Sequence, residues 1–562
     1  MLLRCLKYPK NGTYALCLFV LLISFLNQGY SQRDVEFNLW KEDINYLRKE
    51  VNQNFPFLFK KTKREDWNKI VDSLLAEIKG LENHQILFGL AKAVSAFGYG
   101  HTEIEYNKQE IDLHRVPLNL YYFNDGIYIE GVKPKFSRAL GCKVISIENV
   151  PIDEVLDKIR PIVPVENEQY FKAYGLIYLT IPEVLHAQGI TSTLKRTITF
   201  KLLTSNHVTI EVSFGSEKWS NTQNNVRYGH TKFDGEWMPV QNSTVPLYLR
   251  YMNEPYDFEY IESLKTVYVR QSEIGDGPKE TMDAFYQRIF EFIDTNDVKR
   301  FILDLRLNGG GNNRKNQIII KNILQTPKIN IRGKFYAIIG RRTFSACQNL
   351  VNELEKYTNV LFVGEPTAEN VNFFGDTYPL RLPNSGIIVN LSFAWWQDKP
   401  DWEYAPWTFP HLPVELTFEQ FKAGKDPYLS KALKYKYQEG DFIFNPMETL
   451  QSLFLSGDMR GLREMLLNLI EDQRFQHFDF QNRLEIAGLN LINSKRYKQG
   501  ILVFRIILEI FPETAKSWYN LAFAHYLSKD DDLAIKALQE AGEIDKTYPG
   551  LSILKARILR NQ

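Results

Sequence analysis

The chain has 562 residues, enough for about three or four domains of ordinary size. Hydrophobic residues make up 44% of it and charged residues 24%, which excludes a largely disordered chain, a collagen-like fibre and a small disulfide scaffold. The formal net charge of +1 provides no overall basic field. Composition therefore gives no indication of a nucleic-acid partner or of binding to an anionic membrane.

The first residues are typical of a secretory signal peptide. The cations Arg4, Lys7 and Lys10 precede an apolar run at residues 14–26. Because this run is about 13 residues long and a bilayer span needs about 20, a membrane anchor is the less favoured alternative. We expect the signal peptide to be residues 1–31, with cleavage after Ser31. The mature protein is then exported, periplasmic or extracellular, with no stable membrane span.

Residues 32–110 form a predicted N-terminal helical region, in which apolar residues recur at helical spacing from 36 to 98. Region 111–250 is expected to be rich in strands, because segments such as GIYIEGV and RTITFKLL are short and β-branched or aromatic. Within it, residues 141–159 predict a strand, a tight turn and a short helix. This segment resembles the second half of a PDZ domain, which would bind a peptide C-terminus. An ordinary hairpin followed by a helix explains it equally well.

Region 251–435 alternates strands with helices. The apolar segments FILDL (301–305), KFYAII (334–339) and NVLFVG (359–364) are separated by helical patterns, which predicts βαβ units and a parallel sheet. A β-rich tail containing several tryptophans follows. The predicted fold class is therefore α/β, in a multi-domain chain.

Region 440–562 is predicted to be helical and to contain two incomplete tetratricopeptide-like repeats. A spacing of 34 residues aligns Gly488 with Ala522, and the flanking sequences match without a gap. Such repeats bury a shared face and offer a short groove, so this region is a candidate surface for a protein partner. An unrelated pair of helical hairpins is the alternative, and a cap that stabilises the rest of the protein is another.

Ser345 follows a predicted strand and opens a predicted helix. Open α/β sheets bind ligands at this edge, and the first amides of a helix are unpaired and partially positive. The Ala346 N–H is therefore a natural donor to an oxyanion. Taken alone, the serine is more simply explained as a helix N-cap.

A run of three glycines at 309–311 follows the FILDL strand. Glycines let backbone amides approach a ligand closely, so Gly310 N–H is a candidate second donor. A flexible turn or a phosphate nest would use the same residues, but the lysine and serine of a phosphate-binding loop are absent. A reactive serine needs a base, and His101, in a turn after Gly98 and Gly100, is the candidate.

Four phrases occur in one order: GHT at 100–102, DLRLNGGG at 304–311, GRRTFSACQN at 340–349 and VGEPT at 363–367. Together they resemble the tail-specific, or C-terminal-processing, serine protease family in its tricorn-core-like branch, over roughly residues 36–425. The resemblance implies a peptidase with Ser345 as nucleophile, His101 as base, and an oxyanion hole made by Ala346 and Gly310. The implied substrate is a peptide or an unfolded or C-terminally exposed polypeptide.

The chain departs from the family at three places. Asn370 stands where the better-known branch has its lysine base, which favours the histidine branch. Gly100 stands where the tricorn core has a serine before the histidine. No residue is fixed as the orienter of the histidine: Glu403 is our candidate, and Glu365 and Asp376 are rivals.

Other functions stay open from the sequence. The same architecture could hold a non-catalytic protein that binds a peptide or a hydrophobic ligand, since a fold does not dictate a function. No metal site and no cofactor is predicted, because no cluster of His, Cys, Asp and Glu has zinc or calcium spacing. Cys142 and Cys347 are the two cysteines after the signal peptide, and buried free thiols are the simplest interpretation of them.

Overall fold

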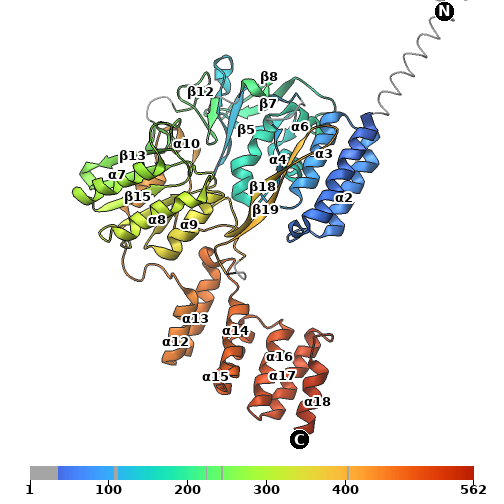
Figure 1. Ribbon diagram of the computed structural model, residues 1–562, viewed down its shortest axis with the longest axis vertical. Coiled ribbons are helices and arrows are strands. Elements are labelled where there is room, and N and C mark those ends of the chain that lie inside the picture. Colours follow the sequence, from blue (N-terminus) through green and yellow to red (C-terminus); the bar gives the residue numbers. More distant parts are fainter. Residues whose placement is uncertain (1–35, 107–111, 223–224, 242–244, 401–403, 562) are drawn as a thin grey trace, which may run out of the picture. The chain divides into compact units, whose positions relative to one another are not determined.

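The computed structural model describes residues 36–106, 112–222, 225–241, 245–400 and 404–561. The predicted signal peptide and Glu403 lie outside these ranges. The chain divides into two compact units, residues 1–399 with 406–436, and residues 400–405 with 437–562. Both contain helices and the first also contains sheets, so the protein is a mixed α/β one (Figure 1). Among the described helices, none is both long and apolar enough to cross a bilayer.

The first unit begins with helices. Residues 36–54 are helical, and α2 (Arg64–Glu77) and α3 (Asn83–Ser95) follow. Trp67 of α2 is fully buried and donates its indole N–H to the carbonyl of Ala93 at 2.8 Å. Helix α3 is buried on most sides, and Gly98 beyond its end has φ +66°, a conformation that costs glycine little. The chain turns there and enters the segment that contains His101.

A mainly antiparallel sheet follows, in the strand order β12-β4-β5-β7-β8, with β3 against β4 and β6 against β5. The bounds are β3 Leu118–Phe123, β4 Gly126–Val132, β5 Lys143–Ile147, β6 Val150–Pro151, β7 Thr197–Leu203, β8 Thr209–Gly215 and β12 Met238–Pro239. Glu148 and Asn149, both at positive φ, form the tight turn between β5 and β6, and α4 (Ile152–Ile159) follows. The strand, turn and short helix predicted there are present, and the PDZ likeness stays a prediction.

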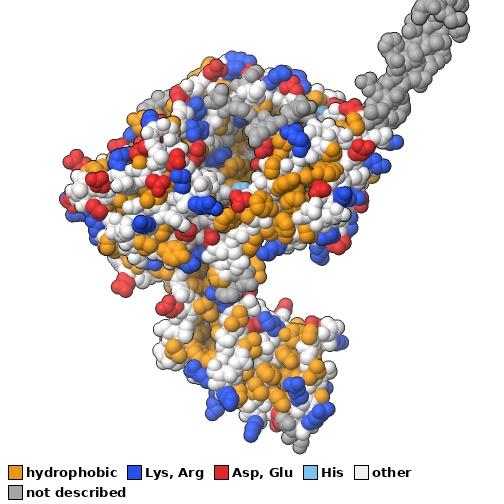
Figure 2. Space-filling model, in the orientation of Figure 1, with side chains coloured by type: hydrophobic (Ala, Val, Ile, Leu, Met, Phe, Trp, Pro, Cys, Tyr) orange, Lys and Arg blue, Asp and Glu red, His pale blue; other side chains and the backbone are white. Residues whose placement is uncertain are grey.

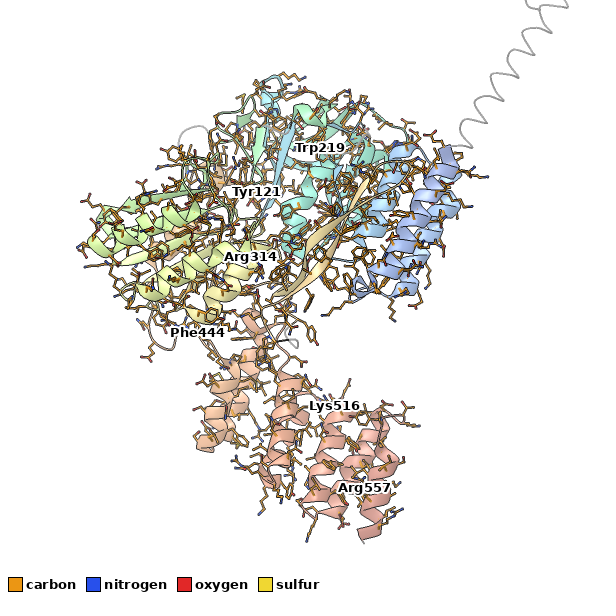
Figure 3. The ribbon with its side chains drawn as sticks, viewed as in Figure 1. Tyr121, Trp219, Arg314, Phe444, Lys516 and Arg557 are labelled. Carbon is orange, nitrogen blue, oxygen red and sulfur yellow. The ribbon has the colours of Figure 1, made fainter. Side chains whose placement is uncertain are left out.

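Short elements complete this part of the unit. They are β2 His114–Arg115 paired with β9 Glu217–Lys218, β10 Val226–Arg227 paired with β11 His230–Thr231, and the helices α5 Glu168–Tyr170 and α6 Pro182–Ala187. Figure 3 labels Tyr121 on β3 and Trp219, which follows β9. Tyr121 stacks on Phe421 with ring centroids 5.9 Å apart, which packs β3 against a segment from the end of the unit.

The second sheet has the strand order β13-β14-β15-β16-β17-β20, with β14 to β20 parallel and β13 antiparallel. Its strands are β13 Tyr256–Ile261, β14 Thr266–Gln271, β15 Arg300–Asp304, β16 Phe335–Ile339, β17 Leu361–Gly364 and β20 Leu412–Pro413. Its connecting helices are α7 Met282–Thr295, α8 Asn316–Gln325 and α9 Ala346–Tyr357. Because each crossover steps to the adjacent strand, the three helices share one face (Figure 1). The βαβ units predicted from the sequence are present.

The two faces of β15 differ in chemistry. Phe301, Leu303 and Leu305 enter the core beneath the helices. On the other face Arg306 makes paired hydrogen bonds to Asp304 and to Asp426, the latter at 3.0 and 2.9 Å. All three charges are buried, so the bidentate geometry is what compensates for their lost hydration. This network ties the end of β15 to α11 (Pro427–Lys434), which Asp426 caps.

A third sheet joins distant parts of the first unit. Its order is β1-β19-β18, with β1 Glu103–Ile104, β18 Asn372–Arg381 and β19 Ile388–Gln397. The pairing of β1 with β19 brings the residues after His101 against a strand that lies nearly 300 residues later in the chain. The short α10 (Phe418–Lys422) follows β20.

The second unit is helical. Its helices are α12 Pro446–Ser456, α13 Met459–Glu471, α14 Phe480–Asn493, α15 Tyr497–Ile510, α16 Ala515–Leu527, α17 Asp531–Ile544 and α18 Leu551–Asn561. A Cβ at Gly488 would lie 2.8 Å from the ring of Phe504, so glycine is what lets α14 and α15 approach closely. Ala522 and Ala534 are fully buried between α16 and α17. The helices expected for 440–562 are present, and their tetratricopeptide-like character stays a prediction.

Candidate active site

Ser345 and the glycine run lie at the carboxyl ends of two neighbouring parallel strands. β15 leads into residues 305–311, and β16 leads into residues 340–345, directly before α9. The two loops are joined by hydrogen bonds from Thr343 Oγ1 to the Leu305 carbonyl at 2.9 Å and from Phe344 N–H to the Asn308 carbonyl at 3.1 Å. Parallel pairing therefore fixes the glycine run beside the serine, and the donor role of Gly310 stays a prediction.

The conformation of Ser345 separates it from an ordinary helix cap. Its φ is +56° and its ψ −130°, a region that residues with a Cβ rarely adopt. Its side chain makes no capping hydrogen bond to the helix that it precedes. The hydroxyl is thus held in a strained position without serving the helix, and such strain concentrates at functional sites.

The backbone amides near Ser345 differ in availability. Among the hydrogen bonds of the described ranges, none uses the Ala346 N–H at the start of α9. The Gly310 N–H instead donates to Asn308 Oδ1 at 2.9 Å. Gly310 nevertheless lies against the serine, because a Cβ on it would stand 2.6 Å from Ser345 Cβ and 3.0 Å from Ala346 N. For Gly310 to donate to an oxyanion, its bond to Asn308 must be exchanged.

His101 lies between aromatic rings and faces a carboxyl group. Its ring stacks on Phe344 with centroids 4.7 Å apart and lies parallel to Phe373 at 6.3 Å. Its Nε2 is 3.6 Å from Glu369 Oε2 and has no hydrogen-bond partner. The same Glu369 oxygen accepts the Ser345 N–H at 2.9 Å. Glu369 Oε2 therefore lies next to both the His101 imidazole and the backbone N–H of Ser345, although 244 positions in the sequence separate these two residues.

Steric contacts explain why residue 100, directly before His101, is a glycine. A Cβ at Gly100 would lie 2.5 Å from the ring of Tyr170 and 2.8 Å from that of Phe344. Its N–H donates to Glu166 Oε2 at 2.7 Å and its carbonyl accepts from the Tyr170 hydroxyl at 3.2 Å. No side chain fits there, which accounts for the absence of the serine that the resemblance implied.

Two buried carboxyl groups, Glu166 and Glu369, lie behind the histidine. Lys61 donates to Glu166 Oε1 at 3.0 Å and so compensates for one negative charge. Burial, together with the neighbouring Glu166, raises the pKa of Glu369 well above its ordinary value. Burial lowers the pKa of His101, against the opposing charges of Glu166 and Asp376. Both shifts favour the neutral form of the group concerned, the uncharged imidazole and the protonated carboxyl.

The sequence predicts three alternative carboxylates as the orienter of the histidine. Glu403 lies outside the described residues. Glu365 is occupied elsewhere, because Arg341 binds it through two hydrogen bonds, one of them 2.8 Å long. Asp376 acts on His101 through its charge. Glu369, to which the sequence assigned no role, is the carboxyl that contacts His101. The sequence did contain a sign of this carboxyl group: Glu369 is an acid two residues after VGEPT and directly before Asn370.

The first unit also contains a group of possible metal ligands, which the sequence did not predict. Among the described residues, Glu82, His84 and His186 bring three potential ligand atoms within 4.8 Å of one another. His84 Nε2 and His186 Nδ1 are 2.9 Å apart and share a hydrogen bond. The group contains none of the candidate catalytic residues. Cys142 and Cys347 are both buried and free.

No family model and no curated protein matches the chain. Among solved structures, mature CPAF complexed with lactacystin is 13% identical over 70% of this chain and 98% of its own, with a TM-score of 0.49. The photosystem II D1 C-terminal processing protease is 12% identical over 70% of this chain and 98% of its own, with a TM-score of 0.32. The tricorn protease is 14% identical over 70% of this chain and 36% of its own, with a TM-score of 0.31.

These neighbours are tail-specific proteases. At such identities and TM-scores the likeness carries no weight for individual residues of this chain.

The close contact of Gly310 with Ser345 predicts a large effect of one methyl group. Gly310→Ala should lower kcat/KM by at least about 10²-fold, because its Cβ displaces the serine and its φ of +106° disfavours alanine. Gly309→Ala is the matched control, since only the Tyr174 hydroxyl, at 3.7 Å, would lie near its Cβ. Peptide hydrolysis by the two purified variants measures the difference. Equal activities of the two variants would show that the close approach of Gly310 to Ser345 has no effect on turnover.

The raised pKa of Glu369 predicts how stability depends on pH. Protonation of Glu369 favours the native state, so stability is lost as pH rises from the unfolded-state pKa, about 4.3, toward the raised folded-state pKa. Glu369→Gln should remove this loss. Its Tm relative to the unmodified protein should therefore rise between pH 5 and pH 8, as measured by calorimetry. A relative Tm that falls over this range would show that Glu369 is charged in the native state.

Proposed function

We propose that the protein is a serine peptidase that hydrolyses peptides or unfolded polypeptides. The observation that carries the proposal is the arrangement of Ser345. Its backbone is strained and its hydroxyl does not cap the helix that follows. Its N–H donates to Glu369 Oε2, the same oxygen that His101 Nε2 faces. Nucleophile, base and free helix amide are the parts that acyl transfer requires. The four sequence phrases independently favour the same activity.

The proposed reaction begins with the attack of Ser345 Oγ on the carbonyl carbon of a peptide. His101 accepts the hydroxyl proton and then transfers it to the leaving amine. The Ala346 N–H and an amide of the 309–311 run hold the oxyanion, and removing one such donor costs about 10²–10³ in rate in comparable sites. Water then attacks the acyl-enzyme, with His101 again as base, and releases the carboxylic acid product.

Glu369 is proposed as a positioning residue for the base and the nucleophile. Its Oε2 accepts the Ser345 N–H and lies 3.6 Å from His101 Nε2, so one carboxyl group sets the position of both residues. The oxyanion that forms on the substrate balances the charge of the His101 imidazolium. Glu403 remains a proposal for the same task, and comparison of Glu369→Gln with Glu403→Gln distinguishes them.

The cellular setting is also a proposal. The signal-peptide pattern of residues 1–31 favours a protein that acts outside the cytoplasm. The helical second unit, with exposed apolar side chains such as Leu467 and Ile553, is the part that we propose contacts a protein partner. Figure 2 shows apolar side chains gathered on the visible face of these helices.

Hydrolysis of a reduced, unfolded protein and of a fluorogenic peptide set tests the activity. Ser345→Ala and His101→Ala should each lose at least about 10³-fold in kcat. Because burial lowers the pKa of His101, the acid limb of the kcat/KM profile should lie below pH 6.5, the ordinary histidine value.

His477→Ala is a control, since that histidine lies in the second unit. Residual activity of Ser345→Ala equal to that of the unmodified protein would overturn the proposal. An acid limb above pH 6.5 would remove His101 from the role of base.

A further inference from the structure

Two buried histidines from different helices of the first unit contact each other. His84 is the second residue of α3, and His186 is the fifth residue of α6. Their exposed fractions are only 6% and 9%, and His84 Nε2 lies 2.9 Å from His186 Nδ1. Glu82, directly before α3, lies beside them, with its Oε2 3.7 Å from His84 Nδ1. The three residues thus bring one potential ligand atom each within 4.8 Å of one another.

These three donors are a set that binds zinc in proteins. Two imidazole nitrogens and one carboxylate oxygen leave the fourth tetrahedral position to water. Zinc bonds of about 2.0–2.2 Å place tetrahedral ligand atoms about 3.3–3.6 Å apart, so the two nitrogens need to separate by only about 0.4 Å. The side chain of Glu82 is 57% exposed, which leaves it room to turn and supply its oxygen.

The hydrogen bond between the histidines marks the position that a metal ion would take. It holds one proton between two nitrogens, and each of these nitrogens is a metal ligand when it carries no proton. When a metal ion replaces the shared proton, the imidazole that carried it takes a proton on its other nitrogen instead. Both histidines therefore stay neutral with one N–H each, and binding requires no net loss of protons.

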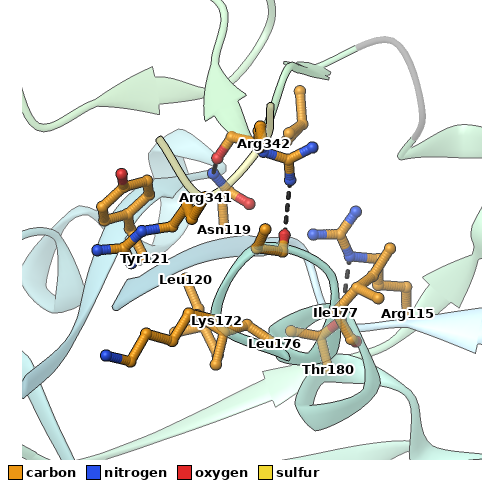
Figure 4. Close-up of a pocket in the computed structure, with 13 residues that line it drawn as sticks. Arg115, Asn119, Leu120, Tyr121, Lys172, Leu176, Ile177, Thr180, Arg341 and Arg342 are labelled. Atoms are coloured by element: carbon orange, nitrogen blue, oxygen red, sulfur yellow. Dashed lines mark hydrogen bonds between the residues drawn. The ribbon is translucent and has the colours of Figure 1, made fainter. Parts of the chain in front are cut away.

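The helices that carry the ligands are held by other contacts as well. At the start of α3, the Asn83 side chain accepts the Trp40 indole N–H at 3.0 Å. The residues directly before α6 are held by β2, because the Arg115 guanidinium donates to Thr180 Oγ1 at 3.1 Å, a bond drawn in Figure 4. The two imidazoles are thus positioned before a metal ion binds, as a tight site requires.

The charges around the cluster leave the carboxylate of Glu82 available. Within the described ranges, no lysine or arginine forms an ion pair with it. Glu183 of α6 is already engaged, because it accepts hydrogen bonds from the Arg196 side chain and from the His114 backbone N–H. The positive end of the α3 dipole opposes a cation, and the negative charge of Glu82 at the same end offsets this effect.

We propose that Glu82, His84 and His186 bind one Zn²⁺ ion that joins α3 to α6. Imidazole donors suit Zn²⁺, whereas Ca²⁺ and Mg²⁺ take oxygen ligands. The two histidines are 102 positions apart, so no local spacing in the sequence predicts the site. Because α3 leads into the turn before His101, the ion would stabilise the support of the candidate base. The site does not depend on the proposed peptidase activity.

Binding of the metal alone tests the site. The purified protein, without an affinity tag, is stripped of metal with a chelator and titrated with Zn²⁺ in competition with a chromophoric chelator. We expect one equivalent of Zn²⁺ to bind with a Kd below about 10 µM. Co²⁺ in the same site should give the visible absorption spectrum of a four-coordinate ion, which loosely bound surface metal does not give.

Substitutions then locate the ion. His84→Gln, His186→Gln and Glu82→Gln should each weaken Zn²⁺ binding at least about tenfold. His207→Asn is the control and should retain the affinity, since His207 is an exposed histidine in the turn between β7 and β8 and asparagine tolerates its φ of +60°.

Thermal unfolding gives a second measurement. Zn²⁺ at 100 times its Kd should raise the Tm of the unmodified protein and of the control by about 3 °C or more. The rise in the three ligand variants should be no more than about half as large, because each binds at least about tenfold more weakly.

No stoichiometric binding of Zn²⁺, or an affinity that stays unchanged in any one of the three ligand variants, would overturn the site. The histidines would then only join the two helices through their hydrogen bond. If a buried histidine variant fails to fold, Glu82→Gln still decides the result, because the Glu82 side chain is exposed.

Discussion

The buried carboxyl group of Glu369 joins the two parts of the chain from which the candidate site is assembled. One of its oxygens accepts the Ser345 amide and faces His101 Nε2. The serine comes from a parallel βαβ unit, and the histidine from a turn after an N-terminal helix. Pairing of β1 with β19 supplies the mechanical support for this meeting. The stacking of His101 on Phe344 and the hydrogen bonds of Gly100 to Glu166 and Tyr170 hold the histidine there as well.

Burial also decides the charge of this region. A second carboxyl group, Glu166, lies beside Glu369, and Lys61 compensates for only one of the two. Burial and the neighbouring Glu166 raise the pKa of Glu369, and burial lowers the pKa of His101. The lowered pKa favours the neutral imidazole, which is the form that a general base needs.

Local pattern was sufficient to predict much of this structure. The strands around FILDL and KFYAII, the helix after Ser345 and the helices of 440–562 follow from periodicity and turn residues. The glycine run beside the serine follows from the adjacency of parallel strands. The partner of His101 was not predicted: Glu369 stands directly before Asn370 in the sequence, but only the tertiary geometry of its loop brings its carboxyl group to the imidazole. The engagement of Gly310 with Asn308 is likewise a tertiary contact.

The central claim is that Ser345 is an activated nucleophile, and covalent labelling tests it most directly. The purified protein is treated with a fluorophosphonate, and the adduct is located by intact mass and peptide mapping. We expect one adduct, on Ser345, absent from Ser345→Ala and strongly reduced in His101→Ala. Absence of any adduct on the folded protein, or an adduct that persists in Ser345→Ala, would contradict the claim and favour a binding protein built on the same fold.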